Sequence, residues 1–262
     1  MKEEIYQELI GNMDEIQDKV VNFVKDEVTK RGFKKVILGL SGGIDSALVA
    51  FIVAKAIGPE NVYSIMMPYK TSSKESIEHA ELVVKATGIN CKKIEITPMV
   101  DAYFGIAGEA SGLRRGNYMS RTRMCVLFDN SAKENALVVG TSNKTELLLG
   151  YGTQFGDMAC GINPIGELLK AQVWELSRRM GVPKEVIDKK PSADLWAGQT
   201  DEEELGFSYD LADEILYHII YKNKNEEEIK NMGYDKEVVE SIFKKIARNE
   251  YKRNMPTIAK IK

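Results

Sequence analysis

Ser41-Gly42-Gly43-Ile44-Asp45-Ser46 decides the fold, because it joins the apolar run Val36-Ile37-Leu38 to the apolar stretch 47–52. This order predicts a strand, a glycine-rich turn and the start of a helix. Such a turn aims several backbone N–H groups and the positive end of a helix at one point, which favours phosphate. Asp45 lies in the same loop, and a carboxylate beside phosphate calls for a divalent cation between them. The loop therefore predicts a magnesium–nucleotide site.

Composition limits the class of protein. The chain has 262 residues, 44% of them hydrophobic and 29% charged, which is enough for one large or two small domains with a real core. A net charge of −3 implies no general affinity for nucleic acid. No apolar run approaches the roughly 20 residues of a membrane helix, and the acidic N-terminus has no signal-peptide core. These features exclude membrane proteins and general nucleic-acid binders.

The cysteines are few and widely spaced: Cys91, Cys125 and Cys160. An odd, scattered set argues against a disulfide framework and for a reducing compartment. We expect these thiols to be buried, and we expect a cytoplasmic enzyme.

Strand and helix patterns alternate along the chain. Strands are expected at 36–40, 62–67, 91–96 and 137–139, and helices at 5–28, 46–57, 73–87, from 98, 114–134, 170–180 and 237–251. Alternation of this kind predicts an α/β fold with a doubly wound parallel sheet flanked by helices, as one domain over residues 1–262. Ligands of such sheets bind at the carboxyl ends of the strands, where the loop at 41–46 and the Gly140-Thr141 turn meet.

Two segments are rich in glycine or in acidic residues: 105–116 and 197–206. We expect both to be loops that order over a bound substrate.

The phosphate loop is neither a Walker A motif, since no Gly-Lys-Ser/Thr ending follows, nor a GxGxxG motif. The bland alternative is a tight turn that binds nothing. Ser-Gly-Gly-Ile-Asp-Ser, however, resembles the pyrophosphate-binding loop of the N-type ATP pyrophosphatases, enzymes that adenylate a substrate and expel pyrophosphate. The loop alone does not choose among the members of that superfamily.

A second set of motifs resembles the NAD synthetase family, and the resemblance covers nearly the whole chain. Those motifs are Gly140-Thr141-Ser142-Asn143-Lys144-Thr145-Glu146, Gly150-Tyr151-Gly152-Thr153-Gln154-Phe155-Gly156-Asp157, Asn163-Pro164 with Lys170 beyond it, Pro191-Ser192-Ala193-Asp194-Leu195 and Lys252-Arg253. The resemblance implies an adenine nucleotide alpha hydrolase-like fold and amidation of deamido-NAD to NAD. It further implies ATP as co-substrate, Mg²⁺, an adenylated nicotinate intermediate, release of AMP and pyrophosphate, and a homodimer.

The same resemblance assigns site residues. The expected Mg²⁺ ligands are Asp45 and Glu146; the expected ATP contacts are Gly39, Leu40, Ser41, Gly42, Gly43, Ile44, Asp45, Ser46, Thr141, Lys170 and Ser192. The expected contacts to deamido-NAD are Arg121, contributed across the dimer interface, with Gln154, Gly161, Tyr251 and Lys252. Asp45, Glu146 and Lys170 are the expected catalytic residues, with Asp157 as a candidate to orient or deprotonate ammonium.

Each assignment has an ordinary alternative. Taken alone, Glu146 would be a solvated helix carboxylate, Lys170 a surface lysine and Ser192 a helix N-cap. Many family members carry lysine where Gln154 stands, an acidic residue at Gly161 and histidine at Tyr251. We therefore expect a variant substrate pocket with an unchanged reaction.

The nitrogen source follows from length. Glutamine-dependent members add a glutaminase domain, and this chain has only one expected helix before the phosphate loop, which predicts the use of free ammonia. Two alternatives compete with the synthetase. A tRNA-modifying adenylase predicts a catalytic cysteine pair or a basic surface, and a non-catalytic nucleotide sensor predicts loss of a metal carboxylate or of Lys170.

Overall fold

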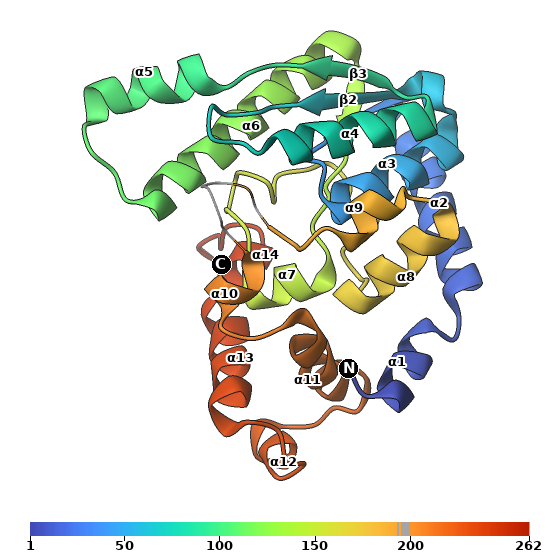
Figure 1. Cartoon of the computed structure of the whole chain (residues 1–262), viewed down its shortest axis with the longest axis vertical. Coiled ribbons are helices and arrows are strands. Elements are labelled where there is room, and N and C mark those ends of the chain that lie inside the picture. The colour runs from blue at the N-terminus through green and yellow to red at the C-terminus, as the bar shows by residue number, and fades with distance from the viewer. Residues whose placement is uncertain (193, 195–199, 262) are drawn as a thin grey trace.

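The centre of the fold is a parallel sheet with the strand order β3-β2-β1-β4. Figure 1 shows β2 and β3 side by side, with helices around them. The computed structural model describes residues 1–192, 194 and 200–261. The strands are β1 (Lys35–Gly39), β2 (Val62–Met66), β3 (Asn90–Lys93) and β4 (Ala136–Val138). The helices are α1 (Glu3–Ile10), α2 (Met13–Lys30), α3 (Ile44–Ile57), η1 (Pro59–Asn61), α4 (Lys74–Thr87), α5 (Thr97–Ala107), α6 (Gly112–Glu134), α7 (Lys144–Leu149), α8 (Lys170–Met180), α9 (Lys184–Asp188), α10 (Asp201–Leu205), α11 (Tyr209–Tyr221), α12 (Glu226–Lys230), α13 (Lys236–Arg248) and α14 (Glu250–Arg253).

Strand β1 shows why helices cover both faces of the sheet. Its side chains alternate, so Val36 and Leu38 join the buried cluster with α2, α3 and α4, while Ile37 joins the cluster with α5 and α6. A parallel strand buried on both faces is apolar at consecutive positions, as this one is. The expected doubly wound α/β fold is confirmed.

The strand order indicates where on the sheet a ligand would bind. From β1 the chain builds outward through β2 to β3, and β4 then pairs with the other side of β1. The winding direction therefore reverses between β1 and β4. Ligands of open α/β sheets bind outside the carboxyl ends of the strands at such a reversal.

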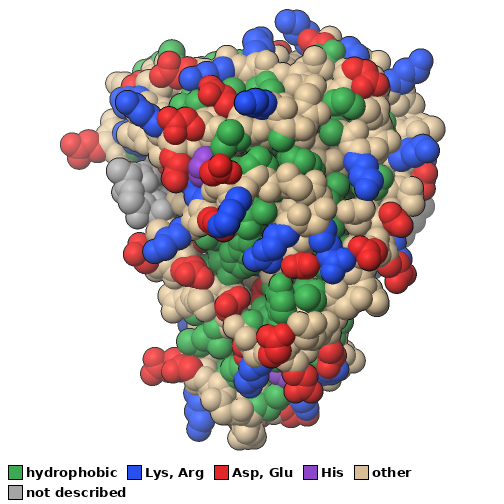
Figure 2. Space-filling model, turned by 45° about the vertical axis from the view of Figure 1, so that its right-hand side comes forward, with side chains coloured by type: hydrophobic (Ala, Val, Ile, Leu, Met, Phe, Trp, Pro, Cys, Tyr) green, Lys and Arg blue, Asp and Glu red, His purple; other side chains and the backbone are tan. Residues whose placement is uncertain are grey.

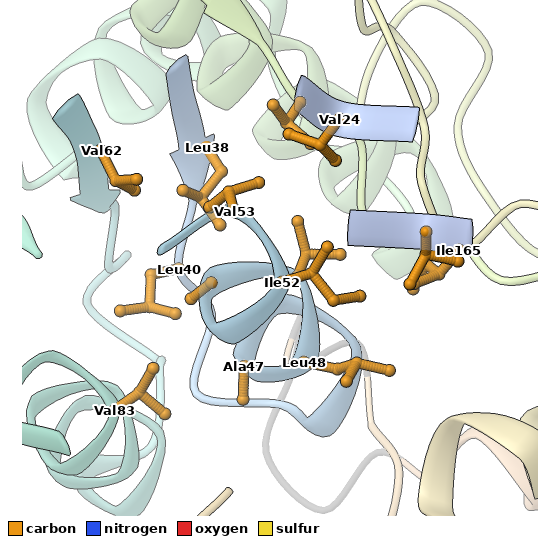
Figure 3. Close-up of a cluster of buried hydrophobic side chains, with 14 of the residues drawn as sticks. Val24, Leu38, Leu40, Ala47, Leu48, Ile52, Val53, Val62, Val83 and Ile165 are labelled. Carbon is orange, nitrogen blue, oxygen red and sulfur yellow. The ribbon is translucent and has the colours of Figure 1, made fainter. Parts of the chain in front are cut away.

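Helix α3 is the most deeply buried helix of the sheet layer. Its side chains Ala47, Leu48, Ile52 and Val53 belong to one buried cluster with side chains of β1, β2, α2 and α4 (Figure 3). All four side chains are fully buried. The helix that carries Asp45 is therefore fixed on most of its circumference.

A second, wholly helical layer lies beyond the strand ends. Helices α11, α12 and α13 form the lower part of Figure 1 and share a buried cluster with α1, α7 and α8. Tyr209, Ile215 and Leu216 of α11 lie at its centre. This layer supports α7 and α8 from the side opposite the sheet.

The N-terminal helix was predicted as one element, and this was wrong. It divides at Gly11 and Asn12 into α1 and α2. The reason is tertiary, because Ile5 and Leu9 of α1 pack in the helical layer, whereas Val24 of α2 packs against the sheet layer. Two poor helix formers stand where the direction changes.

Other differences from the sequence prediction are local. The third strand ends at Lys93, the segment 105–116 is mostly the end of α5 and the start of α6, and 201–205 form α10. Residues 197–199 lie outside the described residues. The predicted burial of the thiols was wrong for Cys91 and Cys125, which are exposed, and Cys160 is half-buried.

Acidic and basic side chains are interspersed on the face shown in Figure 2. Within the described residues, no helix is long and apolar enough to cross a membrane.

The burial of α3 predicts a large stability effect at Leu48, which is 0% exposed. Leu48→Ala should lower the free energy of unfolding by about 2–5 kcal/mol, because the side chain leaves a cavity that rigid neighbours cannot fill. Ile258→Ala, at a side chain 86% exposed, should change it by less than about 0.5 kcal/mol. Chemical denaturation measures both, and equal losses would contradict the assigned core.

Candidate active site

Hydrogen bonds within the loop between β1 and α3 join its beginning to its end. Ser46 Oγ accepts a hydrogen bond from Ser41 N at 3.2 Å and donates one to Gly43 O at 3.0 Å. Gly42 has φ +79°, a backbone region that favours glycine. A Cβ at Gly42 would lie 2.0 Å from the carbonyl oxygen of Ser76 on α4. Side-chain hydroxyls of the loop therefore hold its conformation through hydrogen bonds, and the loop packs directly against α4.

Two carboxylates converge on one ammonium group beside this loop. Lys170 Nζ lies 2.5 Å from Asp45 Oδ2 and 3.1 Å from Glu146 Oε1. Asn143 Nδ2 donates to Asp45 Oδ1 at 2.8 Å. Asp45 and Glu146 lie in the first turns of α3 and α7, and Lys170 is the first residue of α8. Three helices therefore begin at the same point.

Asn143 links the acidic pair to the backbone of α7. Its Oδ1 accepts from Glu146 N at 2.9 Å, and Glu146 Oε2 accepts from Asn143 N at 3.4 Å, which is a capping box. Because the same side chain also binds Asp45, the two carboxylates are held in register. The sequence alone did not reveal this bridging role.

Lys170 is not the surface lysine of the ordinary alternative, because it is only 1% exposed. Its Nζ lies 4.9 Å from the ring centroid of Tyr209. Burial by itself lowers the pKa of Lys170, but the charges of Asp45 and Glu146 outweigh this and raise the pKa above its ordinary value. The side chain is a fixed cation aimed at the loop.

The donor set fits a magnesium ion that arrives with phosphate. Among residues 1–192, 194 and 200–261, no three His, Cys, Asp or Glu side chains converge as a metal site. Mg²⁺ commonly takes one or two carboxylates and fills its other positions with water and phosphate oxygens. Burial and the charge of Asp45 raise the pKa of Glu146, and a cation here would oppose that shift. Asp45 and Glu146 are suitable ligands on these grounds.

The turn at 153–157 fixes Asp157 at the cavity wall. Asp157 Oδ1 accepts from Ser120 Oγ at 2.6 Å and from Thr153 N at 2.9 Å. Lys252 Nζ reaches the neighbouring turn from α14 and donates to Gly150 O at 2.8 Å and Gly152 O at 2.9 Å. The C-terminal helix thereby holds the segment that precedes Asp157.

These groups line one cavity of about 530 Å³. The predicted residues that line it are Gly39, Leu40, Ser41, Gly43, Ile44, Asp45, Ser46, Thr141, Glu146, Asp157, Lys170, Ser192 and Lys252. The loop at 41–46, the turn after β4 and the start of α8 thus share one space, as expected from the strand order.

Other predicted residues do not line the cavity of this chain. Arg121 is exposed and donates to Gln154 O at 3.2 Å, and Tyr251 is exposed on α14. A Cβ at Gly161 would lie 2.5 Å from Leu137 Cδ1, so this position backs onto β4. Gly42 does not line the cavity either, because it packs against Ser76 of α4.

Arg123 and Asp201 are among the lining residues that the sequence prediction missed. Arg123 donates from Nε to Met67 O at 3.0 Å and faces the cavity, whereas Arg121 faces outward. Their spacing of two on a helix indicated that they diverge, but not which one faces inward. Asp201 accepts from Tyr151 and Tyr209 at 2.8 and 3.0 Å, and its place at the head of an acidic run gave no distinguishing signal.

The fold and the loop define an α/β protein with a glycine-rich loop and two carboxylates at the carboxyl ends of its parallel strands. Comparison with known proteins specifies the family. A model of the NAD synthase family matches residues 16–256. The NH(3)-dependent NAD(+) synthetase of Fusobacterium nucleatum subsp. nucleatum is 56% identical over 251 residues, which cover 96% of this chain and 97% of that protein. That of Trichlorobacter lovleyi is 56% identical over 94% of this chain and 90% of its own. The chain belongs to the NAD synthase family.

Solved structures agree with this assignment. The NH3-dependent NAD synthetase from Campylobacter jejuni subsp. jejuni, in complex with the nitrate ion, has a TM-score of 0.81 and 34% identity, covering 95% of this chain and 99% of its own. The NMN synthetase from Francisella tularensis has a TM-score of 0.84 and 31% identity, covering 94% and 98%.

The close approach of Gly42 to α4 predicts that Gly42→Ala weakens ATP binding by about 100-fold. The loop must shift because the added Cβ would clash with Ser76 O. Calorimetric titration with ATP measures this. Gly88→Ala is the matched control, since Gly88 has φ +73° but no atom within 4 Å of its added Cβ. It should cost about 1 kcal/mol of stability and leave ATP binding unchanged.

Proposed function

We propose that this protein catalyses the ATP-dependent amidation of deamido-NAD to NAD with ammonia, releasing AMP and pyrophosphate. The observation that carries the proposal is the Asp45–Lys170–Glu146 cluster at the carboxyl ends of β1 and β4. A non-catalytic nucleotide sensor has no need of that charged cluster. Relatives at 56% identity that bear the name NH(3)-dependent NAD(+) synthetase support the same reaction.

The first half-reaction makes the carboxylate reactive. A nicotinate carboxylate oxygen attacks the α-phosphorus of ATP, and the bond to the bridging oxygen of the β-phosphate breaks, so pyrophosphate leaves with the bonding electrons. The loop at 41–46 supplies backbone N–H groups and a helix N-terminus to the departing phosphates. Lys170, a fixed cation, stabilises the charge that builds there.

Asp45 and Glu146 would hold Mg²⁺ in this site. When bound, the ion neutralises phosphate charge and so assists departure of pyrophosphate. The protein's own contribution is to keep the two carboxylates together through Asn143 and Lys170.

In the second half-reaction ammonia attacks the acyl carbon of the adenylate, the bond to the AMP oxygen breaks so that AMP leaves with the bonding electrons, and the new amide nitrogen releases one proton. Asp157 is our candidate to orient ammonium and to take its proton, because it lines the cavity and is fixed by Ser120 and Thr153. Free ammonia as the nitrogen source is supported by relatives of matching length that are named for it. The glutamine-dependent NAD+ synthetase from Acinetobacter baumannii is matched over only 46% of its chain. We place the enzyme in the cytoplasm.

The direct test mixes the purified protein with ATP, Mg²⁺, deamido-NAD and ammonium. AMP, pyrophosphate and NAD should form in equal amounts. Asp45→Ala should lower the rate by about 100-fold or more, because the Mg²⁺ that would neutralise the phosphate charge loses one of its two carboxylate ligands. Glu240→Ala, on the exposed face of α13, is the control that should leave the rate unchanged. ADP and orthophosphate as products, or full activity of Asp45→Ala, would overturn the proposal.

We also propose a homodimer in which α6 contributes to the interface. Phe128 is an exposed apolar side chain of α6, and Tyr103 and Ile106 are exposed on the adjoining α5. Helix α5 and the start of α6 lie at the upper left of Figure 1, and α6 continues from there across the sheet. Arg121 of the same helix lies outside its own cavity, which suits the expected contribution to a partner's substrate.

The dimer is tested by sedimentation. The wild-type chain should sediment as a dimer at micromolar concentration, and Phe128→Glu should shift it toward monomer because a charge would be buried in the interface. Ile258→Glu, in the exposed C-terminal segment, should not. A monomeric wild-type chain would rule the dimer out.

A further inference from the structure

One fully buried carboxylate has no part in the mechanism above. Asp213 lies in α11, is 0% exposed and does not line the cavity. Burying a carboxylate is costly unless its oxygens are hydrogen-bonded. Both oxygens of Asp213 are bonded, and both partners belong to the two short stretches that carry the catalytic groups.

The first partner is on α7. Thr145 Oγ1 donates to Asp213 Oδ1 at 2.6 Å. Thr145 is buried and directly precedes Glu146. The same hydroxyl oxygen accepts from Lys170 N at 3.0 Å. A single threonine therefore joins the backbone of Lys170 to the residue next to Glu146.

The second partner is on α8. Ala171 N donates to Asp213 Oδ2 at 2.8 Å. Ala171 follows Lys170 in the first turn of α8, where backbone N–H groups have no partner within the helix. A carboxylate at this end is also favoured by the helix dipole. Asp213 and Thr145 together satisfy the first two N–H groups of α8.

Helix α11 also contacts the side chain of Lys170. Tyr209 lies four residues before Asp213, hence on the same face of α11, and its ring centroid is 4.9 Å from Lys170 Nζ. Tyr209 OH donates to Asp201 Oδ2 at 3.0 Å, which fixes the ring. One face of α11 thus contacts both the backbone N–H that follows Lys170 and the ammonium of Lys170.

We propose that Asp213 is a positioning residue that, through Thr145 and the start of α8, holds Lys170 and Glu146 in the geometry that binds Mg–ATP. This inference rests on the proposed function for its catalytic consequence. Residues that orient ligand-bearing side chains from behind typically change affinity or activity by about 10- to 100-fold. No bond is made or broken by Asp213 itself.

The chain offers a matched pair of variants. Thr145→Val keeps the shape of the side chain but removes the hydroxyl that joins Asp213 to Lys170 N. Thr145→Ser keeps the hydroxyl. Asp213→Asn is a third variant, in which an amide NH₂ must face either Thr145 Oγ1 or Ala171 N. Ile215→Val removes one methyl from a buried side chain on the same helix and controls for lost stability alone.

Affinity for Mg–ATP is measured by calorimetry at a temperature well below the unfolding midpoint of every variant. Thr145→Val and Asp213→Asn should each weaken binding by about 10- to 100-fold, and Thr145→Ser should restore it to near wild type. Ile215→Val should lower the unfolding midpoint and leave affinity unchanged. Steady-state kinetics should show kcat/KM for ATP falling in parallel, with KM for deamido-NAD unchanged.

The outcomes separate the two proposals. If Thr145→Val and Asp213→Asn lower the unfolding midpoint but bind Mg–ATP as wild type does, the positioning role is wrong. The same holds if Thr145→Ser is as impaired as Thr145→Val. If the wild-type protein binds Mg–ATP but makes no NAD, the proposed function fails, and the calorimetric series still decides the role of Asp213.

Discussion

The ion cluster of Asp45, Lys170 and Glu146 is the constraint on which the rest of the structure depends. Its members come from the starts of α3, α7 and α8. Like charges on two carboxylates repel, and the buried ammonium between them makes their approach possible. Bringing three helix starts together requires the sheet on one side, to place α3, and the helical layer on the other, to place α7 and α8.

The cluster is not a source of stability, because charges removed from water lose about as much as they gain by pairing. Stability comes from the apolar clusters around it. Leu48 and Ile52 anchor α3 in the sheet layer, and Tyr209 and Ile215 anchor α11 in the helical layer. The helical layer therefore has a function beyond packing, since it holds the two segments that carry Glu146 and Lys170.

Local patterns predicted much of this arrangement. The phosphate loop, the strands flanking it and the start of α8 follow from glycines, apolar runs and spacing, all properties of neighbouring residues. The division at Gly11, the burial of Lys170 and the inward direction of Arg123 depend on what the rest of the chain places beside them. The sequence did not indicate the contacts of Asp213 either, because its partners Thr145 and Ala171 are distant in sequence. The sequence thus predicted which residues lie together around the loop, but not the side chains that support them.

The contact between Gly42 and the Ser76 carbonyl has a mechanical consequence. The phosphate loop and the first turn of α4 pack against each other with no space between them, although the two belong to successive strand–helix units. A displacement of the loop toward α4 must therefore move the start of α4 as well, and a movement of the first turn of α4 toward the loop displaces the loop without passing through the sheet.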